Sequence, residues 1–162
     1  MSEAITAFQI RLAIVDDLPA AAALAAELVR MHHRLDPQRF SLLSANIEAG
    51  YERFLADRLR DPQAVVLVAD ATGEIAAYAY GQLEPRDWMR LLDAHGRIHD
   101  VIVAGGRRRA GVGEAIVARL VSELRQRGAT RFVLETAWRN EAARRFFAKH
   151  GFEPTLVEMT LR

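Results

Sequence analysis

The stretch R-R-A-G-V-G, residues 108–113, decides how this chain is interpreted. It follows an apolar segment, residues 98–103, that is typical of a β-strand, and it precedes an amphipathic helix pattern. That pattern starts near Gly111 and repeats apolar residues three and four positions apart as far as Leu124, and Gly128 predicts its end. A strand, a short loop rich in Gly and Arg, and a helix N-terminus together form an anion-binding arrangement.

The loop favours a phosphorylated ligand. The first backbone N–H groups of a helix have no partner inside the helix, and the helix dipole adds partial positive charge at the same place. Gly111 and Gly113 carry no Cβ, so that a phosphate can approach the backbone closely, and the arginines at 107–109 add formal charge. The alternative is a solvated basic turn before an ordinary helix, which Glu114 in the first turn also fits.

Two blocks carry a resemblance to a known family. Arg108, Gly111 and Gly113 fit the signature R/Q-x-x-G-x-G/A. The block W-R-N-E-A-A-R-R-F-F-A-K-H-G-F at 138–152 is similar to the pattern N-x-x-A-x-x-F/L-Y-x-k-x-G-F. Both patterns are typical of the GNAT (Gcn5-related N-acetyltransferase) superfamily, which the C-terminal third of this chain resembles well and the rest in outline.

The resemblance implies an α/β fold, a GNAT-type mixed, mostly antiparallel central sheet flanked by helices, in a single domain over residues 1–162. It also implies an acetyl-CoA-dependent N-acetyltransferase. Such an enzyme moves an acetyl group to a primary amine of a small molecule or peptide by direct attack in a ternary complex. The alternative is a non-catalytic acyl-CoA-binding or sensing domain with the same fold. Members of this superfamily are frequently homodimers, which makes a homodimer an expectation here.

The resemblance further implies the contacts of acetyl-CoA, the cosubstrate. Backbone groups of the strand would pair with the pantetheine arm, the loop would hold the pyrophosphate, and the amide of Asn140 would bond to the arm. Asn140 is also a residue type that caps helix starts. Phe147 stands where relatives often have an acidic tyrosine, and it has no proton to give; core packing is its alternative role. The cofactor-binding set is Val101, Ile102, Val103, Arg108, Arg109, Ala110, Gly111, Val112, Gly113, Glu114, Asn140 and Phe147.

A general base is needed because a lysine-like amine, with a pKa of about 10.4, arrives as an ammonium ion. Strand alternation predicts that the odd-numbered residues of 97–103 share one face and that Asp100 points to the opposite face, and the resemblance implies that the first of these faces is directed toward the acceptor. His99 therefore occupies a position where the superfamily sometimes keeps its base. A half-buried histidine bonded within the sheet is the alternative. Asp100 and Glu135 complete the set of catalytic candidates.

Composition excludes several classes of function. The chain has 162 residues, of which 51% are hydrophobic and 27% charged, as in an ordinary globular domain. Its net charge of +1 favours neither nucleic acid nor a membrane as partner. The absence of cysteine excludes a thiolate metal site and a cysteine nucleophile, and no histidine spacing matches a metal site. The first residues do not resemble a signal peptide, so that we expect a cytoplasmic protein.

The remaining elements are predicted from periodicity and from turn residues. Helices are expected after Asp16, Asp17 and Pro19, at 44–59, from Gly111, and at 140–150. Strands are expected at 9–14, 64–69, 74–82, 98–103, 131–137 and 155–161. We expect the acceptor to lie over the first helices, the loop at 31–40 and the loop at 84–96.

Overall fold

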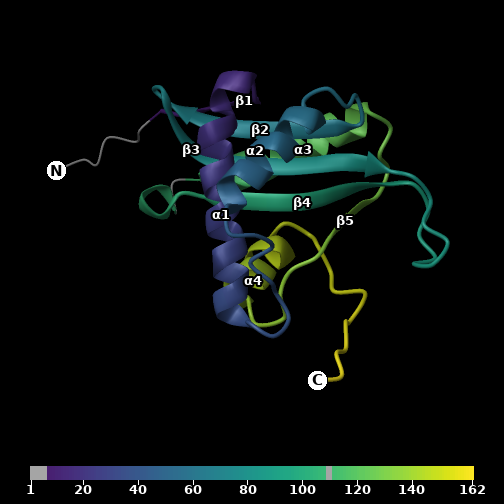
Figure 1. Cartoon of the computed structure of the whole chain (residues 1–162). Helices are drawn as coiled ribbons and strands as arrows, with labels where there is room; N and C mark the ends of the chain where they lie inside the picture. The colour runs from purple at the N-terminus through teal and green to yellow at the C-terminus, as the bar shows by residue number, and fades with distance from the viewer. Residues whose placement is uncertain (1–6, 109–110) are drawn as a thin grey trace.

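The computed structural model describes residues 7–108 and 111–162 and contains a five-stranded sheet with helices on both faces (Figure 1). The strands are β1 (Gln9–Leu12), β2 (Ala64–Ala71), β3 (Glu74–Glu84), β4 (His95–Val103) and β5 (Phe132–Leu134). The helices are α1 (Leu18–Leu35), α2 (Ile47–Arg58), α3 (Val112–Gln126) and α4 (Glu141–Lys149).

The strands follow one another across the sheet in the order β1-β2-β3-β4-β5. The first four are antiparallel, whereas β4 and β5 are parallel. The pairing of β4 with β5 is short, because only residues 96–98 of β4 face residues 132–134 of β5. The expected mixed, mostly antiparallel sheet is therefore confirmed.

The helices divide into two layers. In Figure 1, α1 and α2 lie in front of the sheet and α3 lies behind it. Alternate residues of β2 belong to the two layers, so that Val66 and Val68 pack with α1 while Leu67 and Ala69 pack with α3. The strand predicted at 64–69 is confirmed, and its apolar run is buried on both faces of the sheet.

The expected final strand at 155–161 is wrong. Residues 153–162 form no strand and lie exposed, and Leu161 is fully accessible. An alternating apolar pattern becomes a strand only where a neighbour offers backbone hydrogen bonds, and β5 has just three residues to offer. The segment runs below α4 in Figure 1, where Glu158 and Arg162 form ion pairs with Arg39 and Asp36.

The other strands differ from their predicted bounds at one end or both, and two of them differ most. The strand expected at 131–137 is reduced to β5, because the chain leaves the sheet after Leu134. β4 begins at His95, three residues before the predicted start, since the polar and glycine residues at its beginning conceal the strand pattern. None of the helices in the described ranges has the length and hydropathy needed to cross a bilayer.

Candidate active site

A β-bulge in β4 brings two catalytic candidates onto one face of the sheet. Tyr80 of β3 pairs with Asp100, whereas the next residue, Gly81, pairs with Ile98. His99 is therefore an extra residue that has no partner in β3. Because the bulge interrupts the alternation, the side chains of His99 and Asp100 both reach the layer of α1 and α2. The sequence-based expectation that the odd-numbered residues share one face, with Asp100 on the other, is wrong for this reason. Val101 and Val103 pack in the layer of α3, on the face opposite to His99.

His99 lies against the aromatic ring of Tyr80. The two ring centroids are 4.9 Å apart and the rings are inclined by 14°. Nε2 of His99 is 3.2 Å from Oε1 of Glu84. Burial lowers the pKa of His99 below its usual 6.5, the charge of Arg97 lowers it further, and the hydrogen bond with Glu84 opposes both effects. The imidazole is therefore neutral at neutral pH and able to accept a proton.

Asp100 is the second titratable candidate on this face, and its pKa is shifted upward. Its Oδ2 accepts a hydrogen bond of 3.0 Å from the hydroxyl of Tyr78, a fully buried tyrosine. Burial raises the pKa of Asp100 to about 6, although the hydrogen bond from Tyr78 opposes the shift. Asp100 is thus a stronger proton acceptor than an ordinary aspartate.

Glu135 lies just beyond β5 and is held by two arginines. Its Oε1 is 2.8 Å from Nη2 of Arg97, and Arg90 forms a second ion pair with the same oxygen. Burial acts to raise the pKa of Glu135, but the hydrogen bonds from Arg90 and Arg97 outweigh it, and the net shift is downward. Glu135 is therefore a weaker proton acceptor than His99 or Asp100.

The edge of β4 that faces β5 is open beyond Ile98. Over residues 99–103, no strand of the described residues pairs with this edge. The N–H of Ala104 donates to the carbonyl oxygen of Ala76 in β3 at 2.9 Å. In an antiparallel pair, alternate residues form these backbone hydrogen bonds, so this bond shows which residues of β4 bond with β3. It follows that Ile102 bonds with β3, whereas the backbone groups of Val101 and Val103 point toward the open edge.

The N-terminus of α3 lies beyond the end of β4. Gly111 precedes the helix with a φ of 77°, a left-handed conformation that favours glycine, and no side chain caps the helix. The N–H groups of Val112, Gly113 and Glu114 therefore have no partner within the helix. A Cβ added at Gly111 would meet open space. The predicted binding residues Arg109 and Ala110 lie outside the described residues.

The other residues of the predicted loop have partners within the protein. A Cβ at Gly113 would approach Phe146 to 3.4 Å, so that its missing side chain faces the protein interior rather than a ligand. The side chain of Glu114 pairs with Lys149 at 2.9 Å. Nε of Arg108 is 3.5 Å from the carbonyl oxygen of Val103. Among these described residues, the backbone N–H groups of the first turn of α3 and the exposed guanidinium of Arg108, whose contacts with Val103 and Glu27 are long, remain for an anion.

The two predicted residues Asn140, at the start of α4, and Phe147, within it, have structural roles. Oδ1 of Asn140 accepts a hydrogen bond of 3.1 Å from the N–H of Ala143 and so caps the helix. Phe147 packs edge-on against Phe146 and Phe152, with ring centroids 5.1 and 5.6 Å away. These contacts join Phe147 to the core beneath α3.

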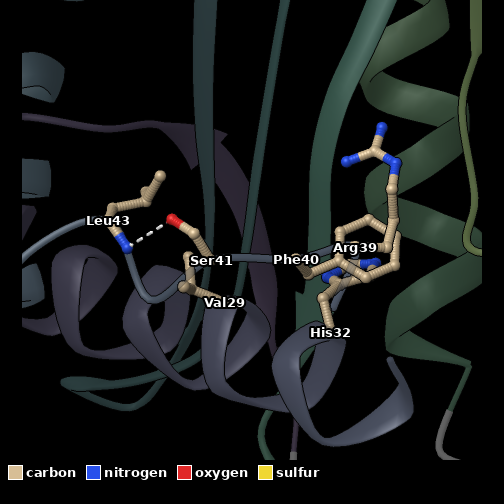
Figure 2. A pocket seen from close by; sticks show the side chains of 6 residues that line it. All are labelled: Val29, His32, Arg39, Phe40, Ser41 and Leu43. Carbon is tan, nitrogen blue, oxygen red and sulfur yellow. Dashed lines mark hydrogen bonds between the residues drawn. The ribbon is translucent and has the colours of Figure 1, made fainter. Parts of the chain in front are cut away.

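Two shallow hollows lie in the segments where the acceptor was expected. One, of about 380 Å³, lies between α1 and the loop that follows it, and Figure 2 shows the ring of Phe40 close to His32 and Arg39 there. It is lined by Val29, His32, Arg39, Phe40, Ser41 and Leu43. The other, of about 370 Å³, lies beneath the loop between β3 and β4 and includes Glu84 and Arg97. It therefore adjoins the carboxylate that contacts His99.

Sequence reasoning missed the polar residues of β3 that surround His99 and Asp100. Tyr78, Tyr80, Gln82 and Glu84 occupy alternate positions of this strand. Their spacing of two could have been found in the sequence, because it places four polar side chains on one face of an otherwise apolar strand. Within the described residues, no group of three or more His, Asp or Glu side chains is arranged to hold a metal ion.

Known proteins similar in sequence to this chain are acetyltransferases. The model of the Acetyltransferase (GNAT) family matches residues 28–152, more than half of the chain. Glucosamine 6-phosphate N-acetyltransferase 1 of Oryza sativa subsp. japonica is 36% identical over 99 residues, which are 60% of this chain and 58% of that protein. The chain thus spans less than two thirds of the length of that relative.

Solved structures share the fold. A tetramutant of a Bacillus halodurans protein superposes with a TM-score of 0.81 at 25% identity, over 95% of this chain and 99% of that one. A predicted acetyltransferase from Clostridium acetobutylicum, with acetyl-CoA, superposes with a TM-score of 0.73 at 18% identity, over 96% of each chain. The chain belongs to the GNAT acetyltransferase family.

Proposed function

We propose that this chain, as a single domain over residues 1–162, is an acetyl-CoA-dependent N-acetyltransferase. The observation that carries the proposal is the open edge of β4 next to the uncapped N-terminus of α3. Backbone groups of Val101 and Val103 suit an amide-containing pantetheine arm, which would lie beside β4 as an additional strand does. The N–H groups of Val112, Gly113 and Glu114 suit the pyrophosphate.

The acceptor amine attacks the thioester carbonyl carbon directly, the C–S bond breaks, and the thiolate of coenzyme A leaves. No covalent bond to the protein is required, in agreement with the absence of cysteine. A backbone N–H of the segment Val101–Val103 would stabilise the negative charge that develops on the carbonyl oxygen. Catalysis would otherwise come from placing the amine against the thioester.

His99 is the base in this proposal and accepts the proton that the ammonium group must lose. Its lowered pKa keeps it neutral, and the bulge turns it toward the layer of α1 and α2. Asp100, whose pKa is raised to about 6, is the second candidate, and Glu135 is the third. Phe147 provides no acid, and none is required because a thiolate whose conjugate acid has a pKa of about 8.5 leaves readily.

A primary amine of a small molecule is the acceptor that we propose first, and a peptide amine second. The relative from Oryza sativa subsp. japonica carries glucosamine 6-phosphate in its name, which supports a small amine. The two hollows beside α1 and beneath the β3–β4 loop have room for such a molecule. We further propose that the protein acts without a metal, in the cytoplasm, and as a homodimer, as members of this family frequently do.

A non-catalytic sensor of acyl-CoA is the second candidate function, which the lack of a hydroxyl at Phe147 favours. Release of free thiol from acetyl-CoA in the presence of a broad panel of amines separates the two functions. Thiol release with at least one amine supports the transferase. Binding of acetyl-CoA without thiol release across the panel supports the sensor.

A single substitution tests cofactor binding. Gly111→Asp places an anionic side chain beside the first turn of α3, where we expect the pyrophosphate. The folded variant should lose affinity for acetyl-CoA, because the added carboxylate repels the phosphates. Unchanged affinity in a folded variant would contradict the proposed site.

A further inference from the structure

Three side chains of β3 form a hydrogen-bonded row that ends at His99. The hydroxyl of Tyr80 donates to Oε1 of Gln82, and Nε2 of Gln82 donates to Oε1 of Glu84 at 3.0 Å. The same oxygen of Glu84 is 3.2 Å from Nε2 of His99. Because these β3 residues alternate along the strand, they share one face, and Tyr80 and Glu84 contact His99.

We infer that Glu84 is a positioning residue, which holds the His99 imidazole in the tautomer that carries its proton on Nε2. An ionised carboxylate has no proton to donate and can only accept a hydrogen bond. The hydrogen between the two groups therefore belongs to Nε2, and the lone pair of the neutral ring belongs to Nδ1. This inference rests on the proposed function, in which His99 is the base, and it names Nδ1 as the atom that takes the proton.

The ring of His99 is held in orientation as well as in tautomer. Tyr80 stacks on it with an inclination of 14°. Glu84 cannot turn freely, since Gln82 donates to the oxygen that faces His99. The side chains of His99 and Glu84 are 32% and 27% exposed, so that their contact is more shielded than an ordinary surface ion pair.

The charges around His99 oppose one another. Glu84 and Glu135 favour the imidazolium form, whereas Arg97 and burial disfavour it, and Asp100 is its neighbour in β4. When the ring accepts a proton on Nδ1, the resulting imidazolium still donates its Nε2–H to Glu84. The carboxylate therefore stabilises the charge that proton transfer creates, as second groups beside catalytic histidines do.

The first test measures the tautomer directly. Nitrogen-15 chemical shifts of the His99 ring are recorded in the free wild-type protein, in Glu84→Leu and in Glu84→Gln. We expect a protonated Nε2 in wild type, the same tautomer in Glu84→Gln, and a mixture of tautomers with a lower pKa of His99 in Glu84→Leu. A wild-type ring protonated on Nδ1, or a tautomer that Glu84→Leu leaves unchanged, would overturn the inference.

The second test measures the consequence for catalysis. Since general base catalysis contributes about 10²- to 10⁴-fold, Glu84→Leu should lower kcat about 10-fold and move the acidic limb of the kcat profile to lower pH. Glu84→Gln should retain most of the wild-type kcat and leave the KM for acetyl-CoA unchanged. Glu123→Gln, which removes a carboxylate of α3 paired with Arg119 and Arg127 in the layer on the other face of the sheet, is the control.

The two tests separate this inference from the proposed function. If the protein transfers no acetyl group, the ring shifts of the free protein still decide whether Glu84 sets the tautomer. If it does transfer and His99→Gln abolishes activity while Glu84→Leu keeps the wild-type kcat and pH profile, the positioning role is wrong. Melting curves of all variants establish that each one is folded.

Discussion

His99 and Asp100, adjacent residues of one strand, extend their side chains to the same face of the sheet. His99 stacks on Tyr80 and Asp100 accepts a hydrogen bond from Tyr78, two residues that share one core cluster. In a regular strand, neighbouring residues point to opposite faces, so that the bulge at His99 is what brings the two groups together.

His99→Gln should reduce kcat/KM about 10²-fold or more, because it removes the base and leaves a residue of similar size. Asp100→Asn should reduce kcat/KM about 10-fold or less. In our proposal the wild-type Asp100 is hydrogen-bonded to Tyr78, and His99 is the base. Steady-state rates of thiol release measure both variants. The reverse order of the two effects would assign the base to Asp100.

The pH dependence of the rate should follow the lowered pKa of His99. A base must be deprotonated to act, so that kcat/KM falls as the pH drops through the pKa of His99, which lies below 6.5. We therefore expect the acidic limb of the profile below pH 6.5 for the wild type. A limb above that value would contradict the account of His99.

Asp100→Asn should stabilise the fold above the pKa of Asp100. Burial raises this pKa from an ordinary 3.8 to about 6, so that the folded state favours the protonated form. The cost of ionising Asp100 therefore grows as the pH rises from 3.8 to about 6 and is constant above that. Two pKa units correspond to about 3 kcal/mol at most. Urea unfolding should show the full gain for the variant at about pH 8 and little gain at about pH 3, below both pKa values. A gain independent of pH would contradict this explanation.

Much of the fold was predictable because the signals are local. The helix pattern after Gly111, the apolar run at 64–69 and the cap at Asn140 depend on residues close together in sequence. The bulge at His99 was not predictable, since it arises from the register of β3 against β4. The segment at 155–161 has a strand-like pattern, but pairing depends on a neighbour that the pattern does not contain.

The candidate site shows the same difference between local sequence signals and contacts that distant residues make. The sequence singled out His99, Asp100 and Glu135, but their relative strength as bases depends on contacts from distant residues. The partners Tyr78 and Glu84 come from another strand, and alternation alone does not show which residue of β4 they meet. The interior direction of the missing Gly113 side chain likewise depends on Phe146 of α4.

Phe147→Ala should destabilise the protein by about 2 kcal/mol, because a half-buried aromatic ring is lost from the core beneath α3. Phe147→Tyr should leave kcat within about 3-fold, since a thiol with a pKa of about 8.5 needs no acid to leave at neutral pH. Thermal melts and steady-state rates measure the two effects. A large rise of kcat in Phe147→Tyr would show that proton donation limits the wild type.

Gly111→Ala should weaken binding of coenzyme A and destabilise the protein by about 1–2 kcal/mol, because φ of 77° is strained for any residue with a Cβ. The strain is conformational rather than steric, since no atom lies within 4 Å of the added Cβ. Gly50→Ala is the matched control. Gly50 lies inside α2 with equal free space, and its substitution should stabilise the helix by about 0.5–1 kcal/mol without affecting coenzyme A.

Isothermal titration of acetyl-CoA into the wild-type protein and into Gly111→Asp tests most directly whether the turn before α3 and the open edge of β4 form a coenzyme A site. The account predicts saturable heat for the wild type and none for the folded variant. Absence of heat with wild-type protein, or an equal Kd for both proteins, would contradict it.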